Sequence, residues 1–444
     1  MQYTVFALLA TGALAASAFA ADDTLHSFTK IRLTDEFWSE GAHFGDFNRD
    51  GKMDVVSGPF WYAGPDFKIR TAYRPADKTS KIKKADGTEV TIAGYKGALG
   101  NENDYSDNFL TYTYDLNSDG WMDIIIYGHP GKEVYWYENP RNQGQGNWAR
   151  YKLLDVLDNE SPMFADLTGD GKPEIICNSS QPNSPGQLGY ATLNWNDPKQ
   201  PATFHPVSPK DKRWHRYTHG IGCGDVNGDG RKDLLEQNGW WEQPASLAGD
   251  PEWKFHPVPF APGPGAAQMW VYDFNGDGLN DVFTCLDPHN HGLAWYQQFR
   301  ENGEIKFTKH IIMNKKPEDN KYGVLFTQPH AIELVDMDRD GVLDVLTGKR
   351  FWAHGPTGDT DPNAPAVLYW FRTVRLPDKS VDFVPYLIDN DSGVGTQVTP
   401  GDLNGDGWPD VVVGNKKGTF VFLHQVRKVS AAEWQAAQPK PLAK

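Results

Sequence analysis

Cysteine is scarce in this 444-residue chain, which contains three: Cys177, Cys223 and Cys285. An odd number leaves at least one thiol unpaired, and each lies inside an apolar run, so we expect buried thiols and no disulfide framework. Basic residues are also few, because 43 Lys and Arg stand against 58 Asp and Glu to give a net charge of −15. No nucleic-acid partner is expected, since a surface that follows phosphates needs clustered Lys and Arg.

Long apolar runs are confined to the first twenty residues. Residues 1–20 carry no charge, run through Ala, Leu and Phe from Val5 onward, and end in Ala18-Phe19-Ala20. This pattern is typical of a secretory signal peptide with an Ala-x-Ala cleavage site, and a membrane anchor is the alternative. No later stretch is long and apolar enough to span a bilayer. We therefore expect a secreted or extracellular protein, or a periplasmic one in a bacterium.

One nine-residue pattern occurs seven times along the chain. It has an acid at positions 1, 5 and 9, Asn, Asp or Thr at position 3, and Gly at position 6. The candidate metal ligands in these acidic loops are Asp46, Asn48, Asp50 and Asp54; Asp115, Asn117, Asp119 and Asp123; Asp166, Asp170 and Glu174; Asp225, Asn227, Asp229 and Asp233; Asp273, Asn275, Asp277 and Asp281; Asp336, Asp338, Asp340 and Asp344; and Asp402, Asn404, Asp406 and Asp410.

The spacing of these loops suits calcium. Alternate residues of a tight loop can turn their side-chain oxygens toward one point, and Ca²⁺ takes roughly six to eight oxygen ligands. An EF-hand would need Glu at position 12, but Glu236 is the one case among the seven copies. The sequence therefore predicts up to seven structural Ca²⁺ ions, with the third copy, which has Thr168 and Glu174, as the weakest site. The alternative is that the loops are simple Asp/Asn-Gly turns.

The segments around each loop predict strands. Apolar, β-branched residues follow position 9, as at 411–413, and an aromatic strand often comes next, as at 135–140. Four strands per repeat and seven repeats predict an all-β fold, a seven-bladed β-propeller of four-stranded blades over residues 21–426, with a polar C-terminal tail at 427–444. The last repeat lacks a fourth strand, and residues 26–33 match the pattern of one. We expect this N-terminal strand to complete the last blade and close the ring.

These motifs resemble known groups. The acidic loops and the strand pattern, over roughly residues 26–425, resemble the FG-GAP and VCBS repeat families of calcium propellers. The His-Gly signatures and the Trp-Tyr-Glu-Asn motif at 136–139 resemble the propeller domain of aldos-2-ulose dehydratases, secreted enzymes that remove water from keto-sugars. The cupin domains of those enzymes are absent, so their isomerase activity is not expected. The resemblance implies that the acidic loops join the first and second strands of each blade.

Ionisable residues then gather on the face opposite the loops. Six residues before each loop the chain has Glu40, Phe109, Glu160, His219, Ala267, His330 and Thr396, equivalent positions that should face one channel mouth. The connections between second and third strands add candidates to the same face, namely His129, His289, His291, Lys349 and Arg350. The candidate catalytic residues are His219, His330, His129, Glu160, His289, His291 and Lys349.

Such a set suits general acid–base chemistry, a bound divalent metal such as Mg²⁺ or Zn²⁺ in the central pocket, or both. The leading hypothesis is a lyase that dehydrates a keto-sugar. The rival hypothesis is a non-catalytic adhesion or glycan-binding propeller, and in either case a small sugar or a glycan is the expected partner. Convergence of His219, His330, His129 and Glu160 would favour the enzyme. The sequence leaves the oligomeric state open.

Overall fold

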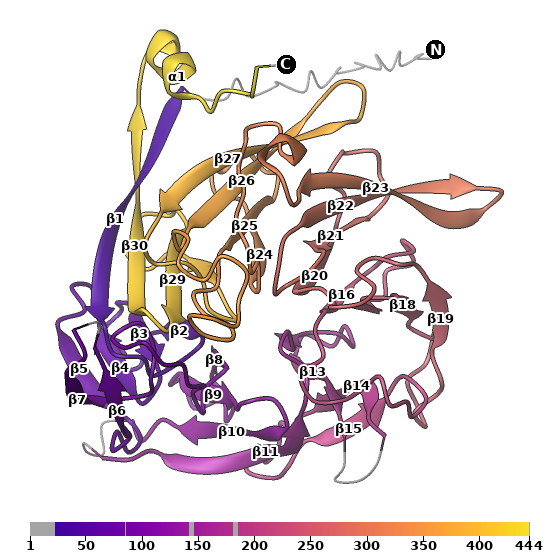
Figure 1. Cartoon of the computed structure of the whole chain (residues 1–444). Coiled ribbons are helices and arrows are strands. Elements are labelled where there is room, and N and C mark those ends of the chain that lie inside the picture. Colours follow the sequence, from indigo (N-terminus) through magenta and orange to yellow (C-terminus); the bar gives the residue numbers. More distant parts are fainter. Residues whose placement is uncertain (1–22, 85, 142–145, 181–184, 444) are drawn as a thin grey trace, which may run out of the picture.

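The structure, a computed structural model, describes residues 23–84, 86–141, 146–180 and 185–443. The expected signal peptide at residues 1–20 lies outside the described residues. The described chain is an all-β propeller, and Figure 1 shows its sheets arranged in a ring around a common axis.

Strands recur in the order that the repeats predict. The first strands are β2 (Ala42–Gly45), β8 (Leu110–Tyr114), β12 (Met163–Ala165), β16 (Ile221–Gly224), β20 (Gln268–Tyr272), β24 (Ile332–Val335) and β28 (Thr399–Gly401). The second strands are β3 (Asp54–Ser57), β9 (Asp123–Tyr127), β13 (Glu174–Ser179), β17 (Asp233–Glu236), β21 (Asp281–Cys285), β25 (Asp344–Gly348) and β29 (Asp410–Asn415). The third strands are β4 (Phe60–Ala63), β10 (Lys132–Glu138), β14 (Gln187–Thr192), β18 (Gly239–Glu242), β22 (Leu293–Glu301), β26 (Leu368–Arg375) and β30 (Gly418–Lys428). The fourth strands are β5 (Ile69–Ala72), β11 (Ala149–Leu157), β15 (Thr203–Pro206), β19 (Lys254–Pro257), β23 (Glu304–Met313), β27 (Val381–Asp389) and β1 (Thr24–Thr34).

Five of the sheets are separate four-stranded blades. The strands β16 to β23 form one eight-stranded sheet, in which two antiparallel sets of four meet through β16 and β20. That junction is parallel and pairs only Ile221 with Gln268 and Gly222 with Met269.

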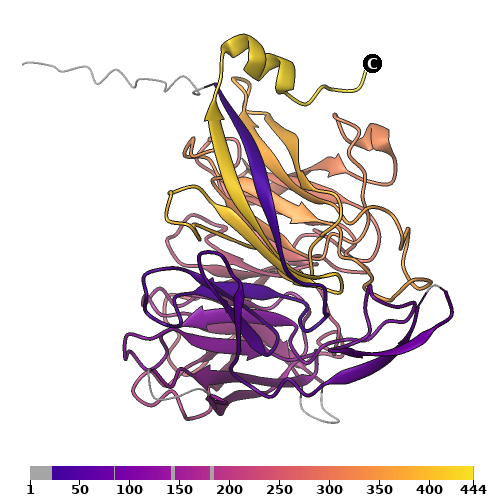
Figure 2. The same cartoon turned by 90° about the vertical axis from the view of Figure 1, so that its left-hand side faces the viewer.

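The ring is closed by the N-terminal strand, as the sequence predicts. Strand β1 pairs antiparallel with β30 from Thr24 opposite Lys428 to Thr34 opposite Thr419. Figure 2 shows the two strands side by side along the edge of the molecule. The last blade is therefore built from both ends of the chain.

The core lies between neighbouring sheets. Strand β9, the second strand of its blade, is fully buried, including Ile124, Ile125 and Ile126. The side chains of such a middle strand pack against the adjacent blades on both faces of the sheet. Cys177 and Cys285 are buried and Cys223 is half-buried, and none forms a disulfide, which confirms the prediction made for them.

The first strands surround the axis. A channel cavity of about 410 Å³ is lined by side chains of several first strands, including His43, Tyr112, Phe164, Trp270 and Glu333. This places the start of each first strand at one mouth of the channel and the acidic loop that follows it at the other.

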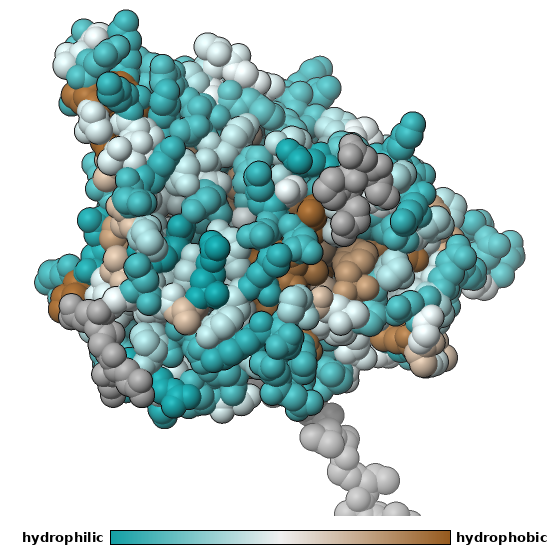
Figure 3. Space-filling view, turned by 90° about the horizontal axis from the view of Figure 1, so that it is seen from below, coloured by the Kyte–Doolittle hydropathy of each residue, from teal (hydrophilic) through white to brown (hydrophobic). Residues whose placement is uncertain are grey.

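The remaining elements lie outside the blades. The insertion after β5 forms a hairpin of β6 (Thr79–Lys83) and β7 (Glu89–Ala93), and a short 3₁₀ turn covers Pro317–Asp319. The C-terminal tail contains the helix α1 (Ala431–Ala437), whose N-cap is Ser430. No helix in the described part of the chain is long and apolar enough to cross a membrane. Figure 3 shows one side of the molecule, where hydrophilic side chains prevail and apolar ones gather near the middle.

Candidate functional site

The seven acidic loops connect the first and second strands, where the resemblance placed them. The acid at position 9 is the first residue of each second strand, and its carboxylate accepts a hydrogen bond from the backbone N–H of position 2. Phe47 N donates to Asp54 at 2.9 Å, and Phe274 N donates to Asp281 at 3.2 Å. Burial raises the pKa of Asp54 to about 6 and that of Asp281 to about 7. This carboxylate therefore anchors the loop to the sheet.

The acid at position 1 organises the rest of the loop. The Asp46 carboxylate accepts from the backbone of Asp50 at 3.1 Å and of Gly51 at 2.9 Å, and the glycine has φ +80°. In the sixth loop, Asp336, Asp338 and Asp340 each offer an oxygen, and these oxygens lie within 4.8 Å of one another. The side chains thus converge as a cation site requires, and calcium in these loops remains a prediction.

Three histidines meet on the opposite face. His219 and His330 come just before β16 and β24, and His289 lies in the connection between β21 and β22. One nitrogen of each ring lies within 4.8 Å of those of the other two, and the ring centroids are 4.7 to 5.7 Å apart. We call His219, His289 and His330 the histidine cluster.

Four ring nitrogens of the histidine cluster form no hydrogen bond with the described protein. Both ring nitrogens of His330, Nε2 of His219 and Nδ1 of His289 are buried and have no hydrogen-bond partner within the described structure. Burial lowers the pKa of His289 to about 3, with His219 and His354 adding to the effect, and burial also holds the pKa of His330 well below its usual range. These two imidazoles are therefore neutral, which is the form that binds a metal.

Glu160 links the histidine cluster to a buried chain of charges. Its Oε2 lies 3.5 Å from His219 Nε2 and 3.3 Å from the guanidinium of Arg350. Arg350, 1% exposed, also pairs with Glu40 at 3.1 Å, and Glu40 pairs with Lys416 at 3.4 Å. Burial alone would raise the pKa of Glu160, but His219 and Arg350 hold that pKa well below its ordinary value. Glu160 is therefore ionised at neutral pH.

Three of the predicted site residues lie outside the histidine cluster. His129 packs against the rings of Tyr105, Phe109 and Tyr217, at centroid distances of 5.2 to 5.5 Å. The ring of His291 contacts the side chain of its neighbour Asn290. The ammonium group of Lys349 donates to Thr327 Oγ1.

The direction of each side chain decides whether these residues reach the histidine cluster. Lys349 and Arg350 are adjacent in the chain, so they turn to different sides, and Arg350 is the one that reaches Glu160. His129 remains on the same face, at the edge of the charged chain. Burial lowers its pKa, and the negative charges of Glu160 and Glu40 act in the opposite direction.

Three residues near the histidine cluster were not among the candidate catalytic residues. Glu40 was placed on this face but was not selected, and His354 and Lys416 were not candidates. Lys416 lies between β29 and β30, the same type of connection that holds His289, so the repeat pattern contained the signal. The side chain of His354 is 48% exposed, its ring centroid lies 4.4 Å from that of His289 in a tilted arrangement, and its Nδ1 pairs with Asp359 at 3.1 Å.

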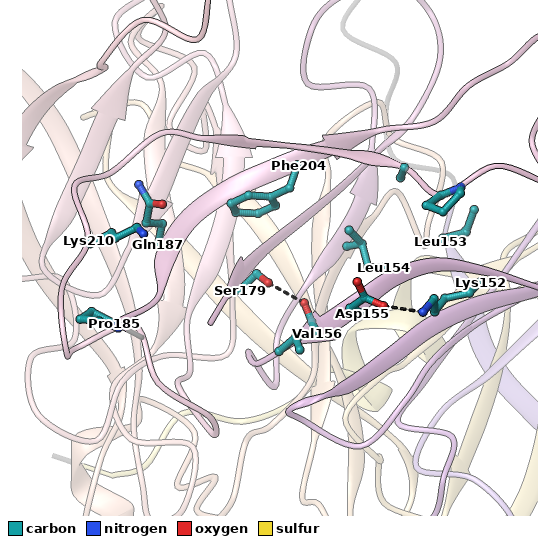
Figure 4. Close-up of a pocket in the computed structure, with 12 residues that line it drawn as sticks. Lys152, Leu153, Leu154, Asp155, Val156, Ser179, Pro185, Gln187, Phe204 and Lys210 are labelled. Atoms are coloured by element: carbon teal, nitrogen blue, oxygen red, sulfur yellow. Dashed lines mark hydrogen bonds and ion pairs between the residues drawn. The ribbon is translucent and has the colours of Figure 1, made fainter. Parts of the chain in front are cut away.

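A separate cavity lies on the side of the molecule. It has a volume of about 240 Å³ and is lined by Leu154 and Val156 of β11 and by Phe204 of β15. Figure 4 shows these side chains around it. Within its lining, Ser179 Oγ donates to Val156 O at 2.7 Å, and Lys152 pairs with Asp155. It shares no residue with the histidine cluster.

Comparisons with known proteins agree on the repeats. The FG-GAP-like repeat model matches residues 115–177 and 273–347, and the FG-GAP repeat model matches residues 394–423. No curated protein matches the chain.

Solved structures resemble the chain only distantly. Rhamnogalacturonan lyase YesW is 14% identical over 90% of this chain and 72% of its own, with a TM-score of 0.38. AofleA from Arthrobotrys oligospora is 12% identical over 71% and 88%, with a TM-score of 0.36. The periplasmic gluconolactonase PpgL of Pseudomonas aeruginosa is 12% identical over 88% and 96%, with a TM-score of 0.38. What the matches establish is that the chain carries FG-GAP and FG-GAP-like repeats on a β-propeller fold.

Proposed function

We propose that this protein is an exported, calcium-stabilised propeller that eliminates water from a keto-sugar at the histidine cluster, as aldos-2-ulose dehydratases do. The observation that carries the proposal is the convergence of Glu160 with His219, His289 and His330. These residues are far apart in the sequence, are held by four different blades, and meet in a mostly buried setting with orphaned ring nitrogens. Such clusters of perturbed titratable groups are typical of catalytic sites.

We propose seven blades in the ring. The eight-stranded sheet counts as two of them, because its parallel junction covers only two residue pairs while each half has the same antiparallel order as the separate blades. Each of the seven then contributes one acidic loop, and Ca²⁺ is the cation that suits their carboxylate and amide oxygens.

The histidine cluster fits a transition metal such as Zn²⁺. Three imidazoles are a common catalytic zinc set, and one ring nitrogen each from His219, His289 and His330 would supply the ligand atoms. When bound, the metal would polarise the carbonyl of the sugar and so acidify the neighbouring C–H.

The chain's own residues would move the protons. Glu160, ionised beside Arg350, would accept the proton from the carbon next to the carbonyl. The electron pair left on that carbon forms the new C=C bond as the C–O bond at the next carbon breaks. His354, half-exposed and held by Asp359, would give a proton to the departing hydroxyl, which leaves as water. The product is an enone, and no oxidant is needed.

The test is turnover of 1,5-anhydrofructose and of a 3-keto-glucoside, followed by the absorbance of the enone. We expect His219→Ala to lose both zinc and activity. We expect Glu160→Gln to keep zinc, measured by metal analysis after dialysis, and to lose activity by about two orders of magnitude or more.

His205→Ala is the matched control, because His205 also pairs with a carboxylate, that of Asp250 at 2.6 Å, but lies on β15 away from the histidine cluster. Full activity in His219→Ala would overturn the mechanism. Sugar binding without any enone formation, in folded protein loaded with metal, would instead favour the glycan-binding propeller.

A further inference from the structure

A large groove lies at the acidic-loop end of the propeller, between the last two blades. Its cavity is about 910 Å³, and its walls come from β26 and β27 on one side and from β1 and β30 on the other. The sixth acidic loop and Trp408 of the seventh loop form part of its lining, and Trp434 of α1 adds another wall. Figure 2 shows β1 and β30 leading to α1. We call this hollow the loop-face groove.

Aromatic side chains line the loop-face groove. Trp370 and Tyr386 stack at a centroid distance of 4.6 Å, and Trp408 and Trp434 are each half-buried. Flat apolar rings set beside polar groups provide surfaces on which sugar rings stack, because the C–H faces of a sugar pack on an aromatic face while its hydroxyls find hydrogen bonds at the edge.

Positive charge exceeds negative charge in the groove. Its lining contains four cations, Arg339, Arg372, Arg375 and Lys428, and two carboxylates, Asp338 and Asp340. This excess is unusual in a chain whose net charge is −15. An anionic ligand would be favoured there.

The arginines differ in what they already bind. Arg372 forms ion pairs with both Asp338 and Asp340. Arg375 donates to the backbone carbonyl of Phe274 at 3.0 Å. Because a carbonyl has no net charge, this hydrogen bond does not compensate the positive charge of the guanidinium. The guanidinium of Arg339, which is exposed, lies 5.2 Å from the centre of the Trp408 ring. Arg339 thus brings a cation and a planar donor edge to the aromatic wall.

An equivalent Arg-on-Trp contact joins the first and second acidic loops. Arg49, at position 4 of the first loop, lies 5.3 Å from the ring of Trp121, at position 7 of the second loop. Arg339 and Trp408 hold the same two positions in the sixth and seventh loops. Trp121 is only 9% exposed and borders no cavity among those described, whereas Trp408 faces the groove. The first pair therefore joins two loops, and the second pair also faces a space that a ligand can enter.

We propose that the loop-face groove is a second carbohydrate site, which binds an anionic oligosaccharide carrying uronate carboxylates. Sugar rings would stack on Trp408 and Trp434, and Arg339 would bind a carboxylate. The groove lies at the opposite end of the first strands from the histidine cluster, so this binding does not depend on the proposed catalysis.

The test is calorimetric titration with trigalacturonate, with the methyl-esterified trimer as the uncharged comparison. We expect the acidic trimer to bind and the ester to bind at least about tenfold more weakly. Arg339→Asn should weaken binding of the acidic trimer by about tenfold, because one charge-assisted contact is lost while Asn tolerates the positive φ of 60° at this position. Arg49→Asn, at the equivalent position with φ 57°, should bind as the wild type does.

Two further variants separate folding from binding and one site from the other. Trp434→Ala, checked by its melting curve, should weaken binding without changing the blades. His219→Ala should bind the trimer as the wild type does. The proposal is overturned if the wild type does not bind trigalacturonate, if it binds the ester equally well, or if Arg339→Asn binds unchanged. It is also overturned if His219→Ala abolishes binding, because the trimer would then occupy the histidine cluster.

Discussion

Arg350 holds two buried carboxylates at the candidate site, those of Glu40 and Glu160. Replacing it by Met keeps the volume and removes the charge, so Glu160 remains buried without its cation. Breaking a buried ion pair in this way costs about 3–5 kcal/mol of the free energy of unfolding. We expect Arg350→Met to show that loss in guanidinium denaturation.

The control for Arg350 is Arg427→Met, since Arg427 is 65% exposed and pairs with Glu433 on the surface. A surface pair contributes about 0–1 kcal/mol. If the two variants have the same guanidinium midpoint of unfolding, the buried ion pairs of Arg350 do not contribute more to stability than the surface pair.

Glu333 provides a pH-dependent test at a single residue. Burial in the channel raises its pKa from 4.5 to about 8, and the N–H of Leu334 opposes this only in part. His43, Tyr112 and Lys232 line the same channel. The unfolded chain releases this proton near pH 4.5 while the folded chain keeps it, so the residue's contribution to stability falls as the pH rises from 4.5 to about 8.

We therefore expect Glu333→Gln to match the wild type in melting temperature below pH 4.5 and to exceed it increasingly up to about pH 8. Glu301→Gln, on an exposed hairpin, should show no such trend. A constant difference between Glu333→Gln and wild type across this range would refute the assignment.

At the scale of the element, strand β1 is what closes the ring. It pairs with β30 over nearly its whole length, and a free β30 would expose a long edge with unpaired N–H and C=O groups. We expect a chain that begins after residue 34 to melt at a much lower temperature and to self-associate with rising concentration, by light scattering. A chain that begins at residue 23 is the matched control. Equal melting curves for the two chains would show that closure by β1 does not stabilise the ring.

The acidic loops show how far repeats predict a local structure. Position 9 was expected to be a metal ligand like positions 1, 3 and 5. In the structure its carboxylate binds backbone N–H groups, as Asp410 does with Leu403 at 2.9 Å and His424 at 2.7 Å. Spacing indicated that the acids belong together, but the second backbone partner of position 9 depends on which residue of the third strand, or of the segment just after it, lies opposite, and the loop sequence does not contain this.

At the scale of the whole molecule, the negative charge is concentrated in the loops. The sixth copy of the loop carries four acids, and each of the other six copies carries three. Ligands that bind only the folded state stabilise it, so removal of calcium should lower stability. We expect EDTA to lower the melting temperature by several degrees or more, and excess CaCl₂ but not NaCl to restore it. An unchanged melting curve in EDTA would count heavily against calcium in these loops.

The sequence by itself determined the all-β propeller, the closing strand and the gathering of Glu160, His219 and His330 at one mouth. Equivalent positions in a repeat must occupy equivalent places on a ring, so residues far apart in the chain could be placed together by counting back from each loop. Only the tertiary structure decided that Arg350 and not Lys349 reaches Glu160, that His289 and not His291 joins the histidine cluster, and that Lys416 ends the charged chain. Those choices depend on side-chain direction in irregular connections, where no period in the sequence sets which way a residue points.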